Sequence, residues 1–156
     1  MSVKSQFLKK LQARQSAPAL PGGKSQADIA EFRLRMEQLQ EQMGEWLVGT
    51  GLNVETLTAS VTDLLVEGGA FDISGIVLRY ENRTIKFMPV FLYGQGVTGC
   101  VETTFHAGGH VTSLGRLFMR TGNVSDWTFN PQSALSRPGN IFDEDAFFHL
   151  IASLLP

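Results

Sequence analysis

The chain has 156 residues and a formal net charge of -2, with 13 Lys and Arg against 15 Asp and Glu. This length suits one domain whose core is stable without cross-links, and the single cysteine, Cys100, excludes an intramolecular disulfide. The small net charge gives no general attraction to nucleic acid, and no run of about 18 apolar residues predicts a membrane span. We therefore expect a cytoplasmic protein that does not bind membranes, and nucleic acid is not its favoured partner; binding of nucleic acid through the basic residues 1–24 stays open as a third hypothesis.

The charge is distributed unevenly along the chain. Residues 1–24 hold five basic and no acidic side chains, so the remaining residues carry eight basic and fifteen acidic ones. The apolar residues Phe7, Leu8 and Leu11 predict a short amphipathic helix, and the Pro and Gly residues of segment 17–23 then interrupt regular structure. We predict that residues 1–24 form a basic flexible arm and that residues 25–156 form a single α+β domain.

Six apolar residues of the next segment recur at spacings of three and four, which places them on one stripe of an α-helix. They are Ile29, Phe32, Met36, Leu39, Met43 and Trp46. Ser25 is the expected N-cap, with Asp28 in a variant of the capping box, so the helix should start near residue 26 and end at residues 49–51. The stripe must cover the protein's own sheet, the same helix of a second copy, or another protein.

Residues 53–67 favour a second, weaker helix that starts at Asn53 and ends before Gly68 and Gly69. Their Thr and Val content lowers helix propensity and leaves a broken strand as the alternative.

From residue 70, short runs of β-branched and aromatic residues alternate with turns and predict five strands. Four of them cover residues 71–80, 84–93, 97–106 and 110–120, and the last, short strand includes Val124, Trp127 and Phe129. Pro89 indicates an edge or a bulge within the second of these strands. Residues 130–140 contain several turn-forming residues and predict an exposed loop.

Asp143 is the predicted N-cap of a closing helix with one apolar face. This face is formed by Phe147, Leu150, Ile151 and Leu154. The order of elements predicts an α+β fold: N-terminal helices, a five-stranded antiparallel β meander and a C-terminal helix, with the helices packed on one face of the sheet.

Three motifs in the sequence are candidate sites for chemistry. Residues 94–99 match G-x-G-x-x-G, but the residues from Val97 onward alternate like a strand, so the segment predicts a turn and not a nucleotide site. His106 and His110 flank a hairpin turn and, with Glu102, provide three metal-ligating side chains; hairpin histidines are more often solvated, and we expect no metal or cofactor. Cys100 lies within a strand, away from any helix N-terminus that would lower its pKa.

No catalytic cluster is evident, so we expect a non-enzymatic protein-interaction module of the adaptor, chaperone or toxin- or effector-binding type. It would act through the apolar helix stripe and an aromatic-rich sheet, because Met and aromatic side chains adapt well to partner helices. The expected partner-binding residues are Phe32, Met36, Leu39, Met43 and Trp46, and the same stripe also makes a homodimer plausible. On the closing helix, His149 is expected to pack or to face a partner.

In size and fold class the chain resembles small acidic bacterial proteins that hold a secreted effector or neutralise a toxin, although no motif supports the resemblance. The alternative function is a small-molecule-binding or enzymatic domain with a pocket between the sheet and the helices. Its polar end would be lined by Tyr80, Tyr93, Glu102, His106, Arg116 and Arg120.

Overall fold

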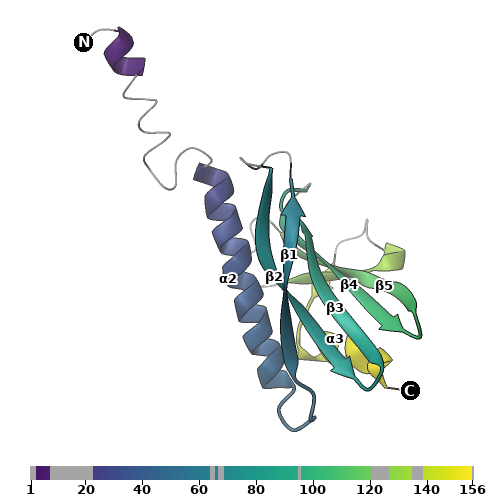
Figure 1. The fold of residues 1–156 in the computed structure, drawn as a ribbon. Helices are drawn as coiled ribbons and strands as arrows, with labels where there is room; N and C mark the ends of the chain where they lie inside the picture. Colours follow the sequence, from purple (N-terminus) through teal and green to yellow (C-terminus); the bar gives the residue numbers. More distant parts are fainter. Residues whose placement is uncertain are drawn as a thin grey trace.

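The computed structural model describes residues 3–7, 23–63, 66, 69–94, 96–120, 127–134 and 139–155. Within these ranges the chain forms one seven-stranded antiparallel sheet, in which the spatial order of the strands follows their order in the sequence. The long helix α2, Gly23–Trp46, runs beside β1 and β2, and the short helix α3, Glu144–Ile151, packs near the other end of the meander (Figure 1). Both helices contribute side chains to one core cluster with the sheet.

The strands are joined in sequence as a meander. They are β1 Val54–Thr62, β2 Ala70–Tyr80, β3 Arg83–Phe91, β4 Val97–Ala107, β5 His110–Arg120, β6 Thr128–Pro131 and β7 Asn140–Ile141. Two 3₁₀ turns, Gln132–Ala134 and Ala152–Leu154, follow β6 and α3. The predicted antiparallel α+β fold is thus confirmed, but the predicted number of five strands is wrong.

The two extra strands lie at the two edges of the sheet. β1 occupies part of the segment for which a second helix was the leading prediction, and it pairs with β2 without interruption from Val54–Leu78 to Thr62–Ala70. Its Thr and Val residues suit a pleated strand, and sheet pairing decides between the two conformations that a short apolar segment allows. β7 begins at the last residue of the predicted loop, and only its two residues pair with β6. The predicted residue Val124 lies outside the described residues.

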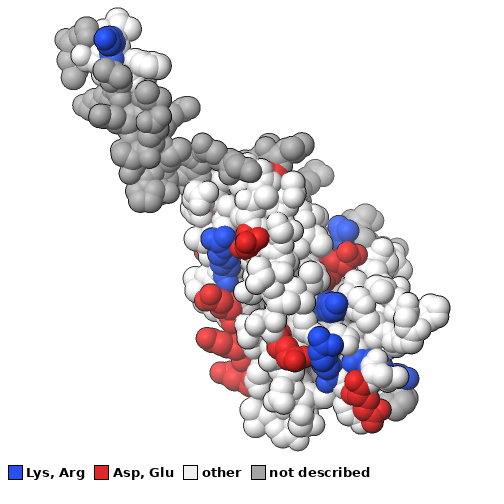
Figure 2. Space-filling model, viewed as in Figure 1, with Lys and Arg blue, Asp and Glu red and all other residues white. Residues whose placement is uncertain are grey.

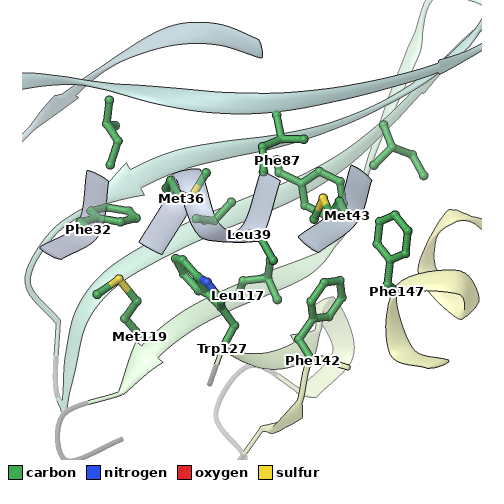
Figure 3. Packing of buried hydrophobic residues seen from close by; sticks show 14 of the residues in the cluster. Phe32, Met36, Leu39, Met43, Phe87, Leu117, Met119, Trp127, Phe142 and Phe147 are labelled. Carbon is green, nitrogen blue, oxygen red and sulfur yellow. The ribbon is translucent and has the colours of Figure 1, made fainter. Parts of the chain in front are cut away.

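The apolar stripe of α2 lies on the protein's own sheet. The side chains of Phe32, Met36, Leu39 and Met43 are at most 2% exposed, and Figure 3 shows them among residues of the sheet and of α3. Complete burial of such a side chain stabilises the fold by roughly 1.5–3 kcal/mol, so the stripe makes a large contribution to the core. The stripe therefore covers the protein's own sheet, which is the first of the three alternatives that the sequence left open.

The start of α2 differs from the prediction. The helix already includes Gly23, so Ser25 lies inside it and is not its N-cap. The side chains of Ser25 and Asp28 instead meet Tyr93, whose hydroxyl donates to Asp28 Oδ2 at 2.6 Å. These polar residues therefore join α2 to the segment after β3. At the other end α2 stops at Trp46, and the predicted stop is realised by Gly49 and Gly51, both with positive φ.

Pro89 coincides with the predicted irregularity in the sheet. The register of β3 against β4 shifts between Pro89 and Phe91, because proline cannot donate a ladder hydrogen bond. The segment from Gly94 to Val97 forms a tight bridge that leads directly into β4. A strand thus follows this G-x-G-x-x-G segment, as predicted. Among the described helices, none is both long and apolar enough to span a membrane.

Candidate protein-docking surface

Helix α3 is held firmly at both of its ends. Asp143 is its N-cap, as predicted: its Oδ1 accepts a hydrogen bond from the Ala146 amide at 2.9 Å. After the helix, Arg83 Nη1 donates to the backbone oxygens of Ser153 and Leu155 at 3.3 and 3.2 Å. The chain that follows α3 is therefore fastened to the start of β3.

An aromatic cluster fixes α3 against the end of α2. Trp46 lies 5.1 Å from Phe147 and 6.3 Å from Phe142, measured between ring centroids. Phe147 also contacts Phe142 and Phe148. Tilted and edge-on pairs of this kind add to the stabilisation from burial, so the cluster sets the position of the helix on the sheet.

The first of two apolar grooves beside α3 has a volume of about 260 Å³ and is called the Tyr80 groove here. It lies between the helix, the end of β2 and the chain that follows α2. Its lining includes Leu52, Tyr80, Phe148, Ile151, Leu154 and Leu155. Leu155 is 57% exposed, so part of the apolar wall is open to solvent.

The second groove, called the Leu150 groove, lies on the other side of α3 and has a volume of about 330 Å³. It is lined by residues of β5, β6, β7 and the helix, among them Leu114, Phe129, Ile141, Ala146, His149 and Leu150. Ile141 is 55% exposed on the short edge strand β7. The two grooves therefore lie on opposite sides of the helix.

Acidic side chains border the surface around α3. Asp143, Glu144 and Asp145 are all exposed at the start of α3. Residues four apart on a helix lie on one side, so Glu144 stands one turn before Phe148 of the Tyr80 groove, and Asp145 one turn before His149 of the Leu150 groove. Figure 2 also shows acidic side chains gathered along the lower part of α2, the end that packs against α3.

The predicted partner-binding residues are mostly buried. Phe32, Met36, Leu39 and Met43 are buried under α2 and face the sheet of their own chain. Trp46 is half-buried and contacts the aromatic cluster under α3. The four buried side chains of the stripe are therefore not accessible on the surface of the folded chain.

The residues suggested for the alternative polar pocket do not all come together. Tyr80 lines the groove named after it, whereas Tyr93 contacts the start of α2. Glu102 and Arg116 are paired neighbours that alternate with the core residues Val101 and Leu117, so they lie on the face of the sheet opposite the helices.

Polar contacts within the chain occupy several side chains of that outer face. Arg120 Nε donates to Thr128 Oγ1 at 3.3 Å, and its Nη2 donates to Asn130 Oδ1 at 3.2 Å. The Ser113 hydroxyl donates to Glu102 Oε1 at 3.2 Å. These contacts tie neighbouring strands together.

The two hairpin histidines are separated by the sheet. His106 pairs with Val111, whereas His110 pairs with Ala107, so the two side chains project from opposite faces. His106 instead contacts Thr104, with 2.9 Å between Nε2 and Oγ1. Desolvation by burial, with a contribution from Lys86, lowers the pKa of His106 below its usual value. Among the described residues, no group of three His, Cys, Asp or Glu side chains is arranged to hold a metal.

Cys100 is fully buried on β4, beside Phe118 and the partly buried Phe91. Desolvation raises the pKa of its thiol to about 12, and the nearby Glu102 raises it further while Arg116 and Arg120 oppose the shift. The thiol is therefore protonated at neutral pH, which does not suit a nucleophile.

The residues that border α3 outside its main apolar face were missed by sequence reasoning. Phe148 lies outside the predicted stripe, and Ile141 directly follows the predicted loop. The sequence does contain one signal for this surface. Phe148 lies outside the apolar face predicted for α3, so the helix has more apolar residues than one buried face requires. Comparison of the chain with protein-family models, with curated proteins and with solved structures finds no match.

Proposed function

We propose that the chain is a non-enzymatic protein-interaction module that binds its partner on the surface around α3. The observation that carries this proposal is the pair of apolar grooves flanking the helix, in which Ile141 and Leu155 are each more than half exposed. Apolar side chains cost free energy when they face water, and a contiguous group of them is typical of interaction sites. The sequence-based proposal of an interaction protein is retained, with the contact surface moved from α2 to α3.

The chemistry of the surface favours one kind of partner, an amphipathic segment with apolar residues on one side and basic residues on the other. Its apolar residues would fill the Tyr80 and Leu150 grooves. Its basic residues would meet Glu144, Asp145 and the acidic end of α2, which supports recognition by charge complementarity. Helical segments that bind in grooves use this division of roles.

The dimensions argue against a small molecule as the main ligand. Small-molecule pockets usually have volumes of about 300–1,000 Å³ and contain a few converging polar groups. The Tyr80 groove falls below this range, and its lining is mostly apolar. The Leu150 groove lies at the lower end of the range and is lined by three strands and a helix.

A pair of synthetic peptides, each about 16 residues long, tests the proposal. Both carry the same leucines at helical spacing, and the polar positions are Lys in one and Glu in the other. We expect the Lys peptide to bind and the Glu peptide to bind at least tenfold more weakly, measured by fluorescence anisotropy at low salt. In methyl NMR spectra, the shifts caused by the Lys peptide should concentrate on Leu114, Ile141, Leu150 and Leu155.

A matched pair of variants locates the contact. Leu150→Asp should abolish binding of the Lys peptide, whereas Val111→Asp should leave it unchanged, because Val111 is an exposed apolar residue that lines neither groove. Circular dichroism serves as the check that both variants fold. Equal binding to both variants, or NMR shifts centred away from α3, would contradict the proposal.

A further inference from the structure

β1 is a long strand at the edge of the sheet with an open side. It has nine residues, it pairs with β2, and no other described strand pairs with it. In an antiparallel sheet, alternate residues direct their N–H and C=O groups to opposite sides, so about half of the β1 residues direct these groups away from β2. Such a row of backbone groups is a template for another strand.

β1 lacks several of the features by which proteins usually protect an edge strand. Protected edges carry Lys or Pro, contain a bulge, or are very short. β1 has no Lys, Arg or Pro, and its register with β2 is unbroken. Its single charge, Glu55, accepts a hydrogen bond from Arg79 Nε at 2.7 Å on the neighbouring strand. β7, at the opposite edge, has only two residues.

We propose that β1 is the contact surface for a second copy of this chain, with the two β1 strands antiparallel about a two-fold axis at Thr58. This arrangement joins the two sheets into one, and it goes beyond the docking function proposed for α3. Because Thr58 is the middle residue of β1, this register pairs all nine residues of one β1 strand with the nine of the other. Two-fold contacts of this kind are self-complementary, as a closed dimer requires.

The sequence of β1 suits this register. Thr58 faces its own counterpart, Leu57 faces Ala59 of the second copy, and Glu55 faces Val61 of the second copy. No like charges are therefore opposed across the axis, and the apolar pair adds a favourable cross-strand contact. The pairs also keep each side chain on the same face of the joined sheet, since side chains alternate along both strands.

Charges on α2 are also complementary about this axis. Arg33 and Glu37 line a recess of about 140 Å³ together with Thr58, the residue at the axis. Arg33 is oriented by a hydrogen bond from its Nε to the Asp72 backbone oxygen at 2.9 Å. Because the second α2 would run in the opposite direction, Arg33 of each copy would be on the side of Glu37 of the other, which favours the pairing electrostatically.

Mass measurement provides the first test. Light scattering on a sizing column should give a dimer for the full wild-type chain and a monomer for Thr58→Lys, which places two ammonium groups face to face. We expect the dimer dissociation constant to rise at least about tenfold, and the circular dichroism spectrum to stay unchanged because Thr58 is exposed. Thr112→Lys, on an exposed part of β5, is the matched control and should remain dimeric.

Disulfide cross-linking tests the register. Thr58→Cys should form a covalent dimer on mild oxidation, because facing residues of antiparallel strands have Cα atoms about 4.5–5.5 Å apart, within the range for a disulfide. Thr62→Cys should not, because its counterpart would lie roughly 26 Å away along the strand. The native Cys100 is buried and does not compete.

The outcomes separate this proposal from its rivals. A wild-type chain that stays monomeric at its highest soluble concentration would overturn it, as would a dimer that Thr58→Lys does not weaken or a Thr62→Cys cross-link as fast as that of Thr58→Cys. In each of these cases the peptide-binding experiment at α3 still stands by itself, because the two surfaces share no residue.

Discussion

The ring centroids of Trp46 and Phe147 lie 5.1 Å apart, and this contact joins the last turn of α2 to the middle of α3. The stripe of α2 and the apolar face of α3 thereby belong to one core, although about 100 residues of sheet separate them in the sequence. Trp46 is the one member of the predicted partner-binding set that is half-buried. Trp46 packs against the buried side of α3, whereas the two apolar grooves beside this helix are open to solvent.

The first prediction concerns this contact. Phe147→Ala removes a fully buried ring that touches three other aromatic rings, so it should reduce the free energy of unfolding by about 3–5 kcal/mol. Urea denaturation followed by tryptophan fluorescence measures the change. Val111→Ala, at an exposed position, is the control and should change the free energy by less than about 0.5 kcal/mol. A loss below about 1 kcal/mol for Phe147→Ala would show that the cluster does not hold α3.

The double variant Met36→Asp, Met43→Asp separates a core stripe from an interface stripe. Both methionines are at most 2% exposed, so two carboxylates at these positions would be buried without partners. We expect loss of the native circular dichroism spectrum. A folded double variant with a lower mass than the wild type would instead show that the stripe is an interface between copies.

Two glycine substitutions should have opposite effects. Gly44 lies in α2 with open space at its Cβ position, so Gly44→Ala should stabilise the protein by about 0.5–1 kcal/mol through higher helix propensity. Gly115 has a φ of 148°, and an added Cβ would overlap the backbone oxygen of Asn130. Gly115→Ala should therefore lower the midpoint of thermal unfolding markedly. Equal midpoints of thermal unfolding for the two variants would contradict the close approach of β5 and β6 at Gly115.

The helix cap links stability to binding. Asp143→Ala removes the acceptor for the Ala146 amide and should cost about 0.5–2 kcal/mol of stability. Because the cap positions the first turn of α3, this variant should also bind the Lys peptide more weakly than the wild type. Asp145→Ala removes an equal charge without removing the cap. If the two variants lose the same stability in urea, the cap does not act as described.

Cys100 predicts a pH dependence in alkaline solution. The pKa of its thiol rises from 9.0 to about 12 on burial, so the unfolded chain releases this proton at a lower pH than the folded chain. The folded state is therefore disfavoured as pH rises above about 9, with a slope of at most about 1.4 kcal/mol per pH unit from this group. The contribution is fully present at neutral pH and is lost toward pH 12.

Urea titrations of the wild type and of Cys100→Ala between pH 8 and pH 10 measure this effect. The window stops at pH 10 because burial and hydrogen bonding to Asp28 also raise the pKa of Tyr93 above its usual value of 10.0. The wild type should lose stability over this range more steeply than the alanine variant. Parallel curves would show that the thiol titrates normally in the folded state.

The apolar spacing along α2 and the alternation in β2 to β5 were sufficient to predict a helix and a meander, because both periods depend on backbone geometry alone. Asp143 was likewise predictable, since a cap acts on amides three residues away. Residues 54–62 were read mainly as a helix because their side chains suit either conformation, and pairing with β2 decided the matter. The prediction that Ser25 is the N-cap of α2 was wrong for a similar reason, because its hydroxyl contacts Tyr93, a residue far along the chain.

The sequence by itself determined that this protein has a long apolar helix face, a β meander and a capped closing helix, since local periodicity and turn chemistry specify these elements. Only the tertiary structure decided which apolar residues are core and which are surface. That choice depends on which side chains the sheet covers: Met36 and Met43 lie beneath α2, while Ile141 and Leu155 remain exposed at the rim of α3. Burial is a property of contacts between distant segments, and no local pattern encodes it.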